Sequence, residues 1–196
     1  MCPWHIHQLV PDFRIEDVWE LPAQGGRDAF QSLVAMAVSQ DPSRSTSRAV
    51  RALFAIRWKL GELLGWDASE SPTQSLRDRL PAELRDTPAP PFKALPFTSL
   101  YRLDDEFAAE VTNRTMHGVL HLGWVPDGPD IYRGQMAVLV KPNGALGTAY
   151  MSAIRPFRHA IVYPAMIGQW ERAWQTQSGH SAPAPASPSA PAPAKP

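Results

Sequence analysis

Apolar and polar residues alternate near the start of the chain. Between positions 13 and 21 the odd positions are mostly apolar and the even positions mostly charged, and this period of two predicts a half-buried strand. Over 30–38 the apolar residues recur at spacings of three and four, which predicts a short helix. Asp28 is expected to cap that helix, and a similar spacing predicts a second helix over 47–64.

Three later apolar runs predict antiparallel strands. They cover 97–103, 107–125 and 131–141, with a break near Asn113 in the second run. The alternation in that run places His117 and His121 on one face and apolar side chains on the other. The predicted sheet therefore has one apolar and one more polar face, and the apolar face needs a cover.

A long helix over 145–174 is predicted to supply this cover, because it is apolar on most sides. Pro156 and Pro164 each remove an internal hydrogen bond and are expected to bend it. The order of a strand, two helices, several antiparallel strands and a long C-terminal helix indicates an α+β fold.

Proline accounts for 21 of the 196 residues and marks the segments expected to be irregular. A Pro/Ala/Ser tract without bulky apolar side chains predicts a disordered tail over 176–196. A second proline-rich stretch, 71–96, is expected to form a loop, with covering a pocket as one option. We therefore predict a single domain over 12–175, preceded by an N-terminal extension over 1–11.

The charge balance argues against one broad class of function. Lys and Arg number 19 and so do Asp and Glu, so the basic surface of a general nucleic-acid binder is not expected. The single cysteine, Cys2, allows neither an intrachain disulfide nor a thiolate metal site. We recognise no secretory signal and no membrane span, and a cytoplasmic location is expected.

Six motifs together resemble the domain-of-unknown-function family 2867. They are DDEFAAE at 104–110, NRTMH at 113–117, HLGW at 121–124, GQM at 134–136, VKPNG at 140–144 and YMSAIRPFRH at 150–159. The family is grouped with the START-like, Bet v 1-like (SRPBCC, polyketide cyclase-like) proteins. The resemblance thus implies a helix-grip fold, in which a curved sheet and the C-terminal helix enclose a cavity for a hydrophobic small molecule. It also implies a separate reductase-like protein as a candidate partner.

Four residues are candidates for catalysis: Arg114, His117, His121 and His159. Four positions apart on one strand, His117 and His121 share a face but lie roughly 13 Å apart at about 3.3 Å per residue. They are too far apart to share one metal ion, and no metal site is predicted. The alternative is that these histidines are hydrogen-bonded structural residues of the sheet.

Arg155 and Arg158 are candidates for binding a ligand carboxylate or phosphate at the cavity mouth. Alternatively, they satisfy the kink at Pro156 or pair with acids such as Glu106 or Glu110. Apolar side chains expected to line the cavity are Trp58, Met116, Leu120, Trp124, Tyr132, Met136, Tyr150, Ile154 and Phe157. The same side chains could instead fill a solid core.

The chain lacks the motifs of nucleotide-binding loops and of nucleophile elbows, so no cofactor is predicted. Our leading hypothesis is a non-catalytic protein that holds a hydrophobic small molecule. One alternative is a cyclase- or dehydratase-type enzyme that uses histidine and arginine in the cavity. Another is an interaction module for a separate protein.

Overall fold

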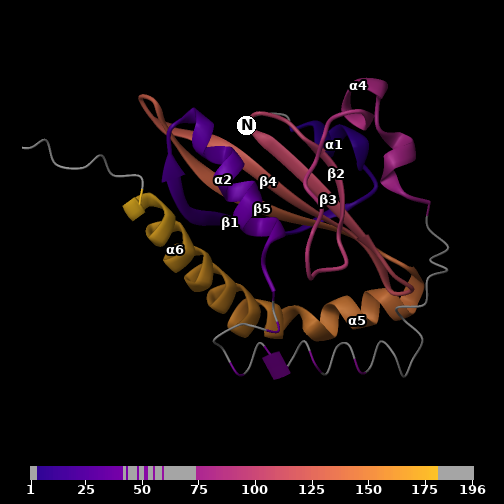
Figure 1. Ribbon diagram of the computed structural model, residues 1–196. Coiled ribbons are helices and arrows are strands. Elements are labelled where there is room, and N and C mark those ends of the chain that lie inside the picture. Colours follow the sequence, from indigo (N-terminus) through magenta and orange to yellow (C-terminus); the bar gives the residue numbers. More distant parts are fainter. Residues whose placement is uncertain are drawn as a thin grey trace, which may run out of the picture.

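A five-stranded antiparallel sheet forms the centre of the protein (Figure 1). The computed structural model describes residues 4–41 and 74–180, with the single residues 43, 48, 51, 52, 55 and 59 between them. Most of the predicted helix over 47–64, including Trp58, and residues 181–196 of the predicted tail lie outside the described residues.

The first strand of the sheet pairs with the last. The strands are β1 (Arg14–Gly25), β2 (Thr98–Arg102), β3 (Glu106–Thr112), β4 (Met116–Gly128) and β5 (Ile131–Pro142). They lie in the order β1-β5-β4-β3-β2. The four predicted strand regions are confirmed, and the break near Asn113 is the turn between β3 and β4.

The alternation predicted along β1 is wrong at the beginning of the strand. The pairing with β5 shifts between Ile15 and Asp17, so Glu16 is the extra residue of a β-bulge. The bulge places Phe13 and Ile15 on the opposite face from Asp17. Ile15 is therefore 54% exposed instead of half-buried.

One face of the sheet is covered by α2 (Phe30–Val38) and α6 (Tyr163–His180). The helix predicted over 30–38 is confirmed, but Asp28 lies in a 3-10 turn, η1 (Arg27–Ala29), and does not cap it. The core on this face includes Phe30, Leu33, Phe107, Leu122, Trp124, Met136, Tyr163, Trp170 and Trp174. These side chains fill the middle of the interface at which the ligand cavity was expected.

The other face is covered by α1 (His5–Leu9), η3 (Leu76–Arg79) and α4 (Ala82–Arg85). The apolar side chains of these segments that are buried against the sheet are Ile6, Val10, Leu76, Leu80 and Leu84. The described parts of the predicted N-terminal extension and proline-rich loop thus belong to the folded core. As a result, the more polar face of the sheet is buried as well.

The C-terminal helix is interrupted between its two prolines. A π-helical turn, η4 (Arg158–Val162), separates α5 (Gly144–Phe157) from α6, and the two helices run in different directions (Figure 1). The predicted bend is confirmed. Only α6 extends over β1 and α2, whereas α5 packs against the end of the sheet and leaves Phe157 half exposed.

Candidate functional site

Among the residues that the structure describes, three carboxylates are buried, and each faces a histidine. Asp17, Glu106 and Glu110 are at most 5% exposed. Their respective histidines are His159, His121 and His117. Burying a charge costs free energy unless the group is paired and hydrogen bonded. Each buried pair therefore serves either a structural or a functional role.

Glu106 holds α1 against the sheet. Its Oε2 accepts hydrogen bonds from the backbone N of His5 (3.0 Å) and from His5 Nδ1 (2.9 Å), and its Oε1 accepts from the backbone N of Ile6 (3.1 Å) and from Tyr101 Oη (2.7 Å). His121 Nε2 lies 3.3 Å from Oε1. Burial acts to raise the pKa of Glu106, but the hydrogen-bonding groups of His121, His5 and Tyr101 outweigh burial and lower it to about 2. Glu106 is therefore an ionised anchor for the first turn of α1.

Glu110 lies four positions after Glu106 on β3 and holds η3 in the same way. It accepts hydrogen bonds from Ser75 Oγ (2.5 Å), the backbone N of Leu76 (2.9 Å) and His117 Nε2 (2.7 Å). Burial acts to raise the pKa of Glu110, but these hydrogen bonds outweigh it and keep the pKa below its ordinary value. His117 and His121 are each about 1% exposed, so both are closed off from solvent.

Asp17 joins β1 to the start of α6. Its Oδ1 lies 2.7 Å from His159 Nε2, and its Oδ2 accepts a hydrogen bond of 2.6 Å from Tyr163 Oη. Burial and the Asp17 carboxylate raise the pKa of Tyr163, so this hydroxyl remains a donor. The π-turn directs the consecutive side chains Arg158 and His159 to this acidic part of β1, where Arg158 pairs with Glu16 and Asp17. His159 remains 42% exposed.

Replacing Asp17 with asparagine is expected to destabilise the protein by about 2 kcal/mol, because the buried groups around it lose a charged acceptor. Chemical denaturation of Asp17→Asn would measure this loss. The matched control is Asp28→Asn, since Asp28 is exposed. Equal effects of the two substitutions would contradict the anchoring role.

An aromatic pocket of about 210 Å³ lies where β4 extends beyond the end of β3. The residues that line this aromatic pocket are Trp4, Arg27, Asp105, Trp124, Val125, Pro126 and Tyr132. Trp124 and Tyr132 were predicted to bind a ligand, whereas Trp4, Arg27 and Asp105 were not. Trp4 and Arg27 come from segments far from β4 in the sequence, so no local pattern could have placed them beside it.

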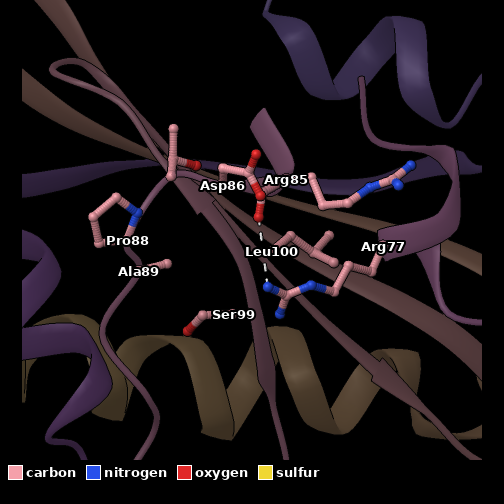
Figure 2. Close-up of a pocket in the computed structure, with 8 residues that line it drawn as sticks. Arg77, Arg85, Asp86, Pro88, Ala89, Ser99 and Leu100 are labelled. Atoms are coloured by element: carbon pink, nitrogen blue, oxygen red, sulfur yellow. Dashed lines mark hydrogen bonds between the residues drawn. The ribbon is translucent and has the colours of Figure 1, made fainter. Parts of the chain in front are cut away.

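A larger recess of about 340 Å³ lies between β2 and the central segment, residues 75–90, which contains η3 and α4 (Figure 2). It is lined by Arg77, Arg85, Asp86, Thr87, Pro88, Ala89, Ser99 and Leu100. Its polar groups hold the segment together: Arg77 Nη2 donates to the Arg85 carbonyl (3.5 Å), and Ser99 Oγ donates to the Pro90 carbonyl (2.5 Å). These bonds assign the recess to the packing of the central segment.

The other described residues that were predicted to bind a ligand lie partly in the core and partly at the surface. Leu120 and Met136 pack in the core, Met116, Tyr150 and Ile154 are half-buried, and Arg155 and Phe157 are exposed. Arg158 pairs with acids of β1 rather than with Glu106 or Glu110. Arg114 is exposed in the turn between β3 and β4.

The structure describes residues 4–41, 74–180 and a few single residues between them. Among them, no group of three or more His, Cys, Asp or Glu side chains could hold a metal ion. None of the helices in this part of the chain combines the length and apolar character needed to cross a bilayer.

The fold and its sites define an α+β protein with a five-stranded antiparallel sheet, a long C-terminal helical segment and buried histidine–carboxylate pairs. Residues 9–165 match the family described as "Protein of unknown function (DUF2867)", and the chain belongs to that family. No curated protein and no solved structure matches the chain.

Proposed function

We propose that the protein binds a small hydrophobic molecule in the aromatic pocket. The observation that carries this proposal is the gathering of Trp4, Trp124 and Tyr132 around one space of about 210 Å³. Aromatic side chains offer a large apolar contact area, and ligand sites are typically apolar with a few polar groups. Arg27 and Asp105 supply such groups here.

The architecture supports the proposal. The pairing of β1 with β5 and the long helical segment over the sheet are consistent with a helix-grip fold, which we propose for this chain with five strands. Because core side chains fill the middle of the interface between the sheet and α6, the ligand would lie at the end of the sheet. The pocket is smaller than the usual range of roughly 300–1,000 Å³, so the ligand would be about one ring system in size.

The proposal does not include catalysis. An enzyme of the cyclase or dehydratase type would need titratable groups that converge on the ligand. The lining of the aromatic pocket contains neither Arg114 nor any of the histidines His117, His121 and His159.

The proposal is tested by titrating the protein with indole as the probe and following backbone NMR shifts around Trp124. Tyr132→Ala is expected to weaken indole binding about tenfold, because it removes one aromatic wall. Phe157→Ala is the matched control, since Phe157 is 51% exposed on α5 and lies outside the pocket lining. Thermal melting would confirm that both variants fold. Absence of shifts with indole, or the same affinity in all three proteins, would overturn the proposal.

A further inference from the structure

We propose that the aromatic pocket selects a zwitterion, namely a small aromatic molecule that carries both a carboxylate and an ammonium group. Aromatic α-amino acids are the chemical class that fits this description. The inference rests on the proposed function and concerns the two charged side chains of the pocket, Arg27 and Asp105.

Both charged groups are available to a ligand. Throughout the described part of the chain, no carboxylate lies within 4.0 Å of the Arg27 guanidinium, and no cationic nitrogen lies within 4.0 Å of the Asp105 carboxylate. The two side chains therefore do not form an ion pair with each other, although both line the same pocket. A guanidinium binds a carboxylate through two parallel N–H groups, and a carboxylate accepts hydrogen bonds from an ammonium group.

The backbone that carries these charges is fixed to the wall of the pocket. Trp124 Nε1 donates a hydrogen bond of 3.1 Å to the carbonyl of Gly26, the residue before Arg27. The backbone N of Trp124 donates a hydrogen bond of 2.8 Å to the carbonyl of Asp105. One tryptophan thus positions both segments, and such preorganisation reduces the entropy lost on binding.

Trp4 can close the pocket because the residue of β4 beneath its ring is a glycine, Gly123. A Cβ atom on Gly123 would lie 2.7 Å from the Trp4 ring, which is closer than van der Waals contact allows. The ring of Trp4 can therefore lie against the β4 backbone, on the face opposite the buried Trp124 side chain. The ligand's ring is placed against the rings of Trp4 and Tyr132, and its two charged groups are placed at the exposed side chains of Arg27 and Asp105.

Four probes that share one ring system separate the contributions. L-Tryptophan carries both charges, indole-3-propionate carries only the carboxylate, tryptamine carries only the ammonium group, and indole carries neither. Each charge at an exposed rim is expected to increase affinity about fivefold at low ionic strength. L-Tryptophan is then expected to bind about 25-fold more tightly than indole.

Two variants assign each charge to its partner. Arg27→Gln is expected to remove the advantage of indole-3-propionate over indole and to leave that of tryptamine unchanged, while Asp105→Asn does the reverse. Arg114→Gln and Asp104→Asn are matched controls on exposed residues outside the pocket lining. Equal affinity for all four probes, or a gain from one charge only, would overturn the zwitterion inference while leaving the proposed function intact. Failure of every probe to bind would overturn the proposed function itself.

Discussion

Replacing Glu106 with alanine is expected to destabilise the protein by about 3–5 kcal/mol, because truncation of a buried ionic group leaves its partners without an acceptor. The backbone N of Ile6 and the hydroxyl of Tyr101 would lose a hydrogen bond inside the core, and His121 would lose its carboxylate. Chemical denaturation at neutral pH measures the free energy of unfolding of Glu106→Ala and of the unmodified protein.

A surface glutamate provides the comparison. Glu171 is exposed on α6, so Glu171→Ala is expected to change stability by no more than about 0.5 kcal/mol. Hydrogen exchange should also become faster in residues 5–10 of Glu106→Ala, since Glu106 holds α1. A loss below about 1 kcal/mol in Glu106→Ala would show that Glu106 is not an anchor.

The effect of Glu106 depends on pH in a defined direction. Its pKa in the folded protein is about 2, below the ordinary value of 4.5. Its contribution to stability is therefore fully present above pH 4.5 and is lost as the pH falls toward 2, an effect of about 3 kcal/mol. Glu106→Gln cannot titrate at this position, so the difference in stability between the two proteins should shrink between pH 5 and pH 2. A constant difference would contradict this role.

The buried histidine–glutamate pairs show which parts of the site could be predicted from the sequence. The alternation along β4 correctly predicts that His117 and His121 share a face, and each histidine pairs with a different glutamate. Two glutamates four positions apart, at 106 and 110, precede these histidines across one turn, and that matched spacing was an available signal for the pairing. The helices that cover this face could not be inferred, because their contacts with the glutamates span 34 to 101 positions.

The other differences between the sequence predictions and the structure arise from local irregularities and from tertiary contacts. The bulge at Glu16 inserts one residue into β1, and a period-two pattern has no means of showing an insertion. The interruption at η4 was foreseeable, since Pro156 and Pro164 flank it. The aromatic pocket was only half foreseeable: Trp124 and Tyr132 lie on adjacent strands, but the segments that bring Trp4 and Arg27 are positioned by tertiary contacts.

Replacing Gly147 with alanine is expected to destabilise the protein by about 3 kcal/mol or more, at the upper end of overpacking effects. A Cβ atom at this position would lie 2.0 Å from the carbonyl oxygen of Thr115. That oxygen belongs to the backbone and accepts a hydrogen bond of 2.8 Å from the backbone N of Asn143, so it cannot move aside without breaking the turn before α5. Chemical denaturation of Gly147→Ala measures the effect.

Gly26→Ala is the matched control for this substitution. A Cβ atom on Gly26 would meet nothing within 4 Å, and its φ of −68° suits any residue, so Gly26→Ala is expected to be neutral or slightly stabilising. The comparison also tests how the C-terminal segment is held. Of the residues of α5, only Gly147 and Met151 are buried, so the close approach at Gly147 determines how α5 meets the sheet. If Gly147→Ala were as stable as Gly26→Ala, α5 would be free to shift on the sheet, and α6 would be held by Asp17 and the core alone.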